Sequence, residues 1–414
     1  MISKEFIKAL PKTDLHVHLD GSLRLGTLIE LARQQDVRLP AYTETKLKNL
    51  VFKDRYEDLV DYLQGFQYTV AVMQDAQSLQ RVAYEFACDN FNEGVRYFEV
   101  RFAPQLHVNP NLDLAQVMIE VNNGLARAKQ EFNASEIIKK GLEPHYDYSI
   151  TVSALRFFNE DTSWYYRNFI YMHRYTKPKR VFALASLELA EAAVYVRNHY
   201  SVPITGLDLA GQEKGFPADD HWEAFQYAHM HFMKKTVHAG EAYGPESIFQ
   251  AITELHADRI GHGYYLLSPD MITDPEINNA RLYIQNLAEY IADRRITVEV
   301  CLTSNMQTNP DLLDISQHAF ADMRNTRLST TICTDNRLIS HTTVTDELTL
   351  AVDTFKLTPK ELKNIIVYGF KRSFFPGSYV EKRAYVRKVI DFYDHVAAQY
   401  PNAGFSLRQD SDDV

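Results

Sequence analysis

Cysteine is scarce in this chain, and its few cysteines do not have metal-binding spacing. The three cysteines are Cys88, Cys301 and Cys333, and no C-x-x-C pair is present. This pattern excludes a cysteine-rich zinc site. Because a sparse and odd number of cysteines is typical of reduced proteins, we expect a cytoplasmic protein.

Long apolar runs and clusters of basic residues are missing as well. No stretch approaches the length of a membrane span, and residues 1–10 are amphipathic without the apolar core of a signal peptide. We therefore expect no membrane partner. Lys and Arg number 44 against 54 Asp and Glu, a net charge of −10. Because phosphate backbones are bound by clustered cations, this balance argues against a nucleic-acid partner, and no RNP-like, zinc-finger or Walker-type motif is present.

Eight short, mostly apolar segments recur along the chain and are separated by helical patterns. The predicted strands span residues 13–19, 95–102, 148–156, 203–210, 234–240, 259–265, 297–303 and 329–334. Most lack a polar alternation, which is typical of strands buried on both faces. Between them, residues 78–93, 114–132 and 187–199 place apolar side chains at helical spacing.

This alternation of strand and helix predicts an α/β fold, a (β/α)8 TIM barrel that forms a single domain over residues 1–414. The pattern alone leaves a doubly wound sheet open, although no Gly-rich first turn supports dinucleotide binding. Insertions near residues 36–77 and 157–180 fall in βα connections, where a barrel builds its active-site rim. We expect extra helices in the first insertion. The second is aromatic and basic, and is either a packed helix or a lid or oligomer contact. Residues 409–414 form a short acidic tail.

The first predicted strand carries the pair His16 and His18 on either side of Val17. Side chains at positions i and i+2 of a strand point to the same face, so both imidazoles aim at one point. A divalent metal can use two such nitrogens, but two unrelated core histidines would show the same pattern.

Polar residues also follow the fifth, sixth and eighth predicted strands. They are His238 with Glu241, then His262, then Asp335. Each alone is more often a core histidine, a helix cap or a turn residue. In a barrel, however, the carboxyl ends of all strands meet on one face. Nitrogen and oxygen ligands without sulfur suit zinc, and iron or cobalt less specifically. The predicted metal ligands are His16, His18, His238 and Asp335.

A zinc ion lowers the pKa of a bound water and so supplies a nucleophile near neutral pH. Such a site requires an acid and a group that orients the water. Glu241, three residues after His238, can serve as the general acid. His262, if it is not a ligand, can orient the water and stabilise charge. We expect Asp335 to take part in catalysis as well as in metal binding, and His18 to face the substrate.

Several blocks of the sequence together resemble the adenosine deaminase family. They are HVHLDGSLR, EVRFAPQLH, ITGLDLAGQE, TVHAGEAYGPESI, DRIGHGY and TDNRLIS, in the family's order, between about residues 13 and 347. The P-C-x-x-C motif of cytidine-type deaminases is absent. The resemblance implies a zinc-dependent barrel hydrolase, with one Zn²⁺ per chain, that removes the 6-amino group of a purine as ammonia.

The resemblance also implies roles for single residues. His16, His18, His238 and Asp335 match the zinc ligands, and His262 matches the histidine that orients the hydroxide and aids proton transfer. Glu241 takes the place of the acid that protonates purine N1, which makes C6 electrophilic. Gly211 matches the glycine whose backbone N–H meets purine N3. A side chain at that position would block the close approach of the purine. Asp20 matches the aspartate that accepts from the ribose 5′-hydroxyl.

Asp20 favours a nucleoside as substrate. Adenosine deaminases resemble this chain in having aspartate there, whereas adenine deaminases more often carry glutamate. AMP deaminases need cations for the phosphate, which an aspartate would repel. We therefore expect conversion of adenosine to inosine in purine salvage, with 2′-deoxyadenosine as a further candidate substrate. Adenine or a modified adenosine is the alternative, and a zinc-containing binding protein without turnover is the more remote one.

One position departs from the family pattern, because Asn336 stands where many members have a second aspartate after the metal-binding one. The family's residue contacts purine N7, which is an acceptor, so an aspartate must share a proton to pair with it. The amide of Asn336 can donate a hydrogen bond without that proton. We expect this difference to alter the pH dependence.

Overall fold

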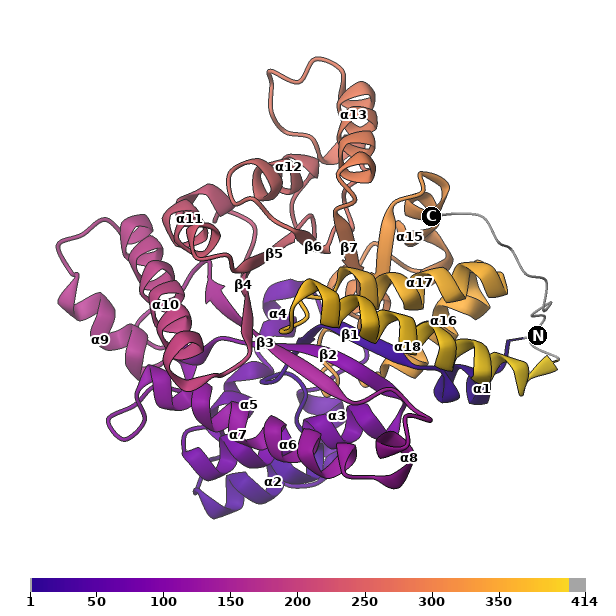
Figure 1. The fold of residues 1–414 in the computed structure, drawn as a ribbon. Coiled ribbons are helices and arrows are strands. Elements are labelled where there is room, and N and C mark those ends of the chain that lie inside the picture. The colour runs from indigo at the N-terminus through magenta and orange to yellow at the C-terminus, as the bar shows by residue number, and fades with distance from the viewer. Residues whose placement is uncertain (1, 402–414) are drawn as a thin grey trace.

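A computed structural model describes residues 2–401 of the chain (Figure 1). Eight parallel strands follow one another around a sheet in the order β1 to β8. Their bounds are Lys12–His18, Val95–Phe102, Asp147–Leu155, Ile204–Ala210, Lys234–Ala239, Arg259–His262, Thr297–Val300 and Ser329–Ile332. Nearly every strand residue is buried, as expected for strands with a packed interior on one face and helices on the other.

The sheet closes on itself between the carboxyl end of β1 and the residues just after β8. Val17 and Asp335 form a parallel bridge, the His18 N–H donates to the Asp335 carbonyl at 2.7 Å, and the Asp335 N–H donates to the His16 carbonyl at 2.8 Å. This closure confirms the predicted (β/α)8 barrel and excludes the doubly wound sheet. The single domain of residues 1–414 stays a prediction, and the predicted tail 409–414 lies outside the described residues.

The last three strands end earlier than predicted. β6, β7 and β8 stop two or three residues before the predicted limits. His262 and Asp335 adopt a left-handed backbone conformation, each with φ of 62°, which turns the chain out of the sheet. After β7 the chain enters helix α14, Leu302–Thr308, almost at once. Apolar composition continues through these turns, so the sequence gives no signal for the ends.

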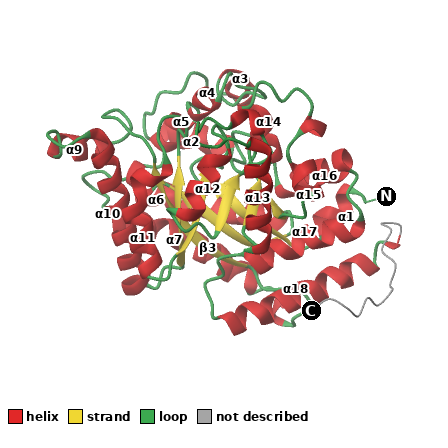
Figure 2. Ribbon diagram, turned by 90° about the horizontal axis from the view of Figure 1, so that it is seen from above, coloured by secondary structure: helices red, strands yellow, loops and turns green. Residues whose placement is uncertain are grey.

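Most helices lie outside the sheet (Figures 1 and 2). The predicted helices 78–93, 114–132 and 187–199 are confirmed as α6, Ala76–Asn92, α7, Leu114–Asn133, and α10, Pro178–Tyr200. The remaining α-helices among residues 2–401 are α1 Lys4–Ala9, α2 Leu25–Gln34, α8 Glu136–Lys139, α11 Trp222–Met230, α12 Pro245–Thr253, α13 Ala280–Asp293, α15 Phe320–Asn325, α16 Val344–Phe355, α17 Pro359–Arg372 and α18 Tyr379–Ala398, besides those of the insertions.

The first insertion adds short helices, as predicted. They are α3 Glu44–Leu50, α4 Leu59–Leu63 and α5 Phe66–Ala71, and they gather at one end of the strands (Figure 2). The second insertion contains α9, Trp164–Met172, which lies at the edge of the molecule in both views. In α9, Tyr165 and Tyr166 are buried against the fold, so this segment is at least in part the packed helix.

Buried ion pairs fill part of the barrel interior. Arg259 pairs with Glu99 and Glu299, and Arg101 donates to Glu299 at 2.9 Å. All four side chains are almost fully buried, so each charge must be compensated inside the barrel. Among the described helices, none combines the length and the apolar character that crossing a membrane requires.

Candidate active site

A cavity of about 550 Å³ opens at the carboxyl ends of the strands. Helices α4 and α5 of the first insertion and residues 157–164 of the second form its outer walls. Eight of the predicted site residues line it. His18, His238 and His262 lie in the last residues of β1, β5 and β6, and the other five follow strand ends: Asp20, Gly211, Glu241, Asp335 and Asn336. His16 is fully buried directly beneath them.

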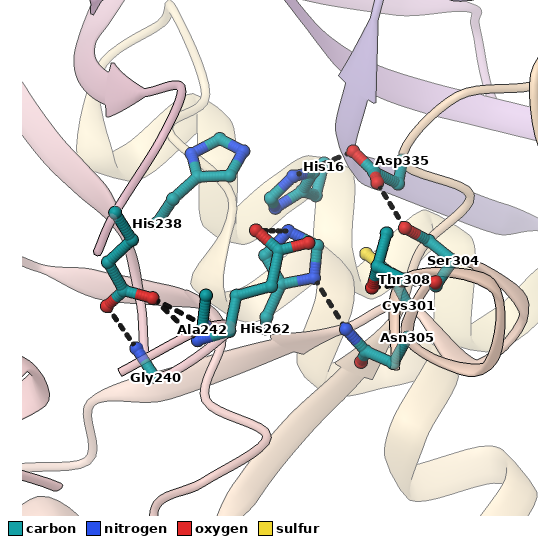
Figure 3. A network of polar contacts seen from close by, with 12 residues as sticks. His16, His238, Gly240, Ala242, His262, Cys301, Ser304, Asn305, Thr308 and Asp335 are labelled. Carbon is teal, nitrogen blue, oxygen red and sulfur yellow. Dashed lines mark hydrogen bonds and ion pairs between the residues drawn. The ribbon is translucent and has the colours of Figure 1, made fainter. Parts of the chain in front are cut away.

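The predicted metal ligands converge in this cavity, and Figure 3 shows three of them, His16, His238 and Asp335. His16 Nε2 lies 3.3 Å from Asp335 Oδ1, and His18 Nε2 lies 3.5 Å from the same oxygen. His18 Nε2 and His238 Nε2 are 3.1 Å apart. The histidines therefore present their Nε2 atoms to one small volume beside the Asp335 carboxylate.

Two carboxylates behind the histidines fix which ring nitrogen faces that volume. His16 Nδ1 lies 2.8 Å from Glu299, and His238 Nδ1 lies 3.0 Å from Asp208. A carboxylate accepts, so each Nδ1 carries the hydrogen and each Nε2 presents its lone pair to the cavity. Arg101 contacts Glu299 and Asp208 together and keeps them charged. Burial acts against these charges, but His238 and Arg101 hold the pKa of Asp208 below its usual range.

This donor set fits a metal ion. His16 Nε2 is buried and has no hydrogen-bond partner within the described residues, a cost that a bound cation would remove. One ligand atom each from His16, His238, His262 and Asp335 lies within 4.8 Å of the others. This group contains His262 in place of the predicted His18, whose Nε2 nevertheless lies 3.1 Å from His238 Nε2, so distance alone does not separate the two as ligands. Three nitrogens and one carboxylate oxygen suit zinc.

The protonation states of His18, His262 and Asp335 favour metal binding. Burial lowers the pKa of His18 and of His262 well below the usual value, so both rings are neutral. Burial also works against the charge of Asp335, yet His16 and the other nearby imidazoles hold its pKa well below the usual range. Ser304 Oγ donates to the other Asp335 oxygen at 2.6 Å.

Glu241 has the opposite electrostatics. Burial, with the negative charges of Asp335 and Glu213, raises its pKa well above the usual value. One oxygen lies 3.7 Å from His262 Nε2. A carboxyl group kept protonated beside a metal-ligand cluster can act as a general acid.

Sequence reasoning missed Glu213, which holds the turn that carries Glu241. Its carboxylate accepts from the backbone N–H groups of residues 240–243 at 2.7–3.1 Å and from the hydroxyl of Ser247. Glu213 belongs to the block ITGLDLAGQE, but nothing in that block shows what its side chain contacts.

The candidate substrate residues lie on the cavity wall. Asp20 is buried, and burial raises its pKa to about 7. Its Oδ1 has no hydrogen-bond partner among the described residues and lies 4.0 Å from His18 Nδ1. Gly211 has φ of 91°, and a Cβ added there would meet no protein atom closer than 3.9 Å. The chain therefore approaches the cavity at Gly211 without a side chain in between.

Asn336 takes part in a buried network with a residue of the first insertion. Its Nδ2 donates to the Tyr62 hydroxyl at 2.8 Å, and that hydroxyl lies 2.9 Å from Ser340. Tyr62 comes from α4 and lines the cavity. The sequence predicted helices here but gave no reason to single out Tyr62.

The chain has extensive similarity to known proteins. A family model for adenosine deaminase matches residues 11–392. The chain belongs to the adenosine deaminase family. It is 34% identical over 387 residues to the adenosine deaminase of Mycobacteroides abscessus, covering 93% of this chain and 95% of that protein. Similarity to adenosine deaminase 1 of Streptomyces coelicolor is 33% over 390 residues, 94% of this chain and 88% of that protein. A probable adenosine deaminase of Dictyostelium discoideum is 34% identical over 375 residues, 90% of this chain but only 42% of that longer protein.

Solved structures with the same fold are more distant in sequence. An adenine deaminase from Arthrobacter aurescens superposes with a TM-score of 0.71 at 20% identity, covering 93% of this chain and 99% of that one. The N6-methyl-AMP deaminase of Arabidopsis thaliana superposes with a TM-score of 0.70 at 23% identity, covering 96% and 100%. These structural similarities show that this chain has the same barrel fold.

Proposed function

We propose that this family member hydrolyses adenosine to inosine and ammonia in purine salvage, and converts 2′-deoxyadenosine to 2′-deoxyinosine in the same way. The observation that carries the proposal is the cavity itself, where the protonated Glu241 faces a histidine and carboxylate cluster in a mostly apolar pocket. A zinc-containing binding protein would have no use for a buried neutral acid at that place. The 34% identity to relatives named adenosine deaminase supports the same activity.

His16, His18, His238 and Asp335 would hold one zinc ion, since their ligand atoms surround the unpartnered His16 Nε2. When bound, zinc activates a water molecule as a nucleophile near neutral pH. Glu299 and Asp208 orient the rings of His16 and His238 for that role.

Glu241 would donate its proton to N1 of the purine, which makes C6 electrophilic toward water. The Gly211 backbone, free of a side chain, would lie against the purine N3 edge. The unpartnered Oδ1 of Asp20 would accept a hydrogen bond from the ribose 5′-hydroxyl. Asn336 would meet N7, and His262 would hold the attacking water.

A nucleoside fits this cavity better than a nucleotide. Among residues 2–401, no lysine or arginine lines the cavity, while Asp20 and Asp161 do. A phosphate dianion would find no cation there, and Asp161 and the ionised form of Asp20 would repel it. We also infer a cytoplasmic location, because all three cysteines are free and two are buried.

The test compares kcat/KM for adenosine, 2′-deoxyadenosine, AMP and adenine with the zinc-loaded chain. We expect kcat/KM for adenosine to exceed that for AMP by at least about 1,000-fold, because the cavity offers no cation to pair with the phosphate of AMP. A higher kcat/KM for adenine, or no turnover of adenosine with zinc bound, would refute the proposal.

The role of Glu241 has its own test. Glu241→Gln should keep zinc, measured by elemental analysis, and lower kcat by about 1,000-fold or more, since proton donation is lost. Glu254→Gln, at an exposed position after α12, is the matched control and should keep full activity. Loss of zinc from Glu241→Gln would show that the residue is a ligand instead.

A further inference from the structure

A chain of buried polar groups lies behind His262, on the side away from the cavity. Asn305 of α14 places its Nδ2 3.0 Å from His262 Nδ1 (Figure 3). The other amide atom, Asn305 Oδ1, lies 3.1 Å from His318 Nε2. His318 follows the short helix η4, Ile315–Gln317, and its Nδ1 accepts from the backbone N–H of Phe320 at 3.0 Å. His262, Asn305 and His318 are each about 1% exposed.

The backbone N–H of Phe320 sets the direction of every hydrogen bond in this chain. A backbone N–H can only donate, so His318 Nδ1 must be the acceptor. Burial lowers the pKa of His318 to about 3, so the ring is neutral and carries its single hydrogen on Nε2. His318 Nε2 therefore donates to Asn305, and the atom that receives this bond must be the amide oxygen.

The orientation of Asn305 then fixes the tautomer of His262. With its oxygen toward His318, the amide presents N–H to His262 Nδ1, which must accept. An imidazole nitrogen that accepts a hydrogen bond carries no hydrogen, so the hydrogen of the ring lies on Nε2, the nitrogen that faces Glu241 and the cavity. Flipping the amide would leave His318 with acceptor roles at both nitrogens and no place for its hydrogen.

We propose that Asn305 and His318 are positioning residues that hold His262 in the Nε2–H tautomer, so that His262 meets the substrate and the attacking water as a hydrogen-bond donor. This tautomer has no lone pair on Nε2. The tautomer therefore distinguishes His262 from His18 as a candidate ligand, which distance alone did not do. His262 is a donor to the reacting oxygen and not a metal ligand. Its task is to hold that oxygen, not to take its proton.

The contrast with the other histidines supports the assignment. His16 and His238 have carboxylates at Nδ1, which place the hydrogen there and free Nε2 for a metal. His262 has an amide N–H at the same position, which reverses the tautomer. An imidazole ring therefore becomes either a metal ligand or a hydrogen-bond donor, depending on the group that contacts its Nδ1.

The test replaces the amide donor by a carboxylate of the same shape. Asn305→Asp can only accept at His262 Nδ1, so it should move the hydrogen to Nδ1 and leave Nε2 bare. The tautomer is read from ¹⁵N NMR of histidine-labelled protein, metal-free and zinc-loaded, with His262→Asn identifying the signals. We expect kcat on adenosine to fall by about 100-fold, as for loss of one donor to a developing oxyanion, with KM changed by less than about threefold.

The kinetic arm rests on the proposed function, but the NMR arm needs no substrate, so the two can fail separately. A wild-type His262 with its hydrogen on Nδ1, or a hydrogen kept on Nε2 in Asn305→Asp, would overturn the tautomer assignment. Unchanged or higher kcat with a switched tautomer would overturn the donor role.

Two further variants keep the proposal testable if Asn305→Asp does not fold. His318→Gln can still accept from Phe320 and donate to Asn305, so it should keep the tautomer and the activity. His318→Leu releases the amide and should give a mixture of tautomers with lower kcat; a wild-type tautomer in this variant would contradict the role of His318. The matched control is Asn309→Asp, whose side chain contacts Tyr265 and Asp311 outside the cavity, and it should leave the His262 signals unchanged.

Discussion

The Glu213 carboxylate is predicted to hold the catalytic turn in place, and Glu213→Gln tests this. Its Oε2 accepts from the N–H groups of residues 241, 242 and 243, and Ser247 and the residue 240 N–H bind Oε1. A glutamine can keep its oxygen at the first three and donate to Ser247, which already accepts from the residue 240 N–H at 3.1 Å. The shape is thus preserved, whereas the bond from the residue 240 N–H to Oε1 and the negative charge are lost.

The magnitude follows from that loss of charge. Hydrogen bonds to charged groups contribute about 1.5–3 kcal/mol and neutral ones about 0.5–1.5, so three weakened bonds cost about 3 kcal/mol. Glu241 belongs to this turn, and a displacement of its carboxyl group by about 1 Å would lower kcat about 100-fold. Removing the Glu213 charge also lowers the pKa of Glu241. Because Glu241 acts in its protonated form, activity is lost as pH rises through that pKa, and this loss should move to lower pH.

The assays are urea unfolding, amide hydrogen exchange of residues 240–243, and kcat against pH. We expect a lower unfolding midpoint, faster exchange in these four amides and an earlier basic decline of kcat. Glu254→Gln serves as the exposed control. Wild-type exchange and an unmoved basic decline in Glu213→Gln would refute the reasoning.

Three other predictions concern the metal, the purine contact and acid stability. Asp208→Asn removes the carboxylate behind His238 and should weaken zinc affinity about 10- to 100-fold in chelator competition; unchanged affinity would contradict the ring-orienting role. Asn336→Asp should lower kcat/KM for adenosine about tenfold at pH 8 relative to pH 6, because a carboxylate needs a proton to pair with purine N7; parallel pH profiles would sink this idea. His107 is buried neutral, donates to the Met73 carbonyl at 3.0 Å, and burial lowers its pKa to about 4. As pH falls below about 6.5, His107 takes up its proton in the unfolded chain before it does so in the folded one. From pH 7 to 4 the wild type should therefore lose about 3 kcal/mol of unfolding free energy relative to His107→Gln. Equal slopes of unfolding free energy against pH in the two proteins would contradict this prediction.

Local pattern was enough to predict the barrel and the positions of its site residues. Strands buried on both faces have a distinct composition, and parallel strands of a barrel place their carboxyl ends on one face. That rule alone brought His16, His238 and Asp335 together from distant parts of the sequence, and the distances of 3.1–3.5 Å around His18 and Asp335 agree with it. The resemblance of ordered blocks supplied the chemistry.

The groups behind these residues were decided only by the tertiary structure. Glu213, Asp208 and Glu299 act on Glu241, His238 and His16 through contacts between different strands and loops, which leave no periodicity in the chain. The tautomer of His262 depends on a backbone N–H at residue 320, three hydrogen bonds away. The sequence determined which side chains reach the cavity, because strand geometry is local. Their protonation, tautomers and orientation depend on burial and on partners far along the chain, so only the folded barrel determines them.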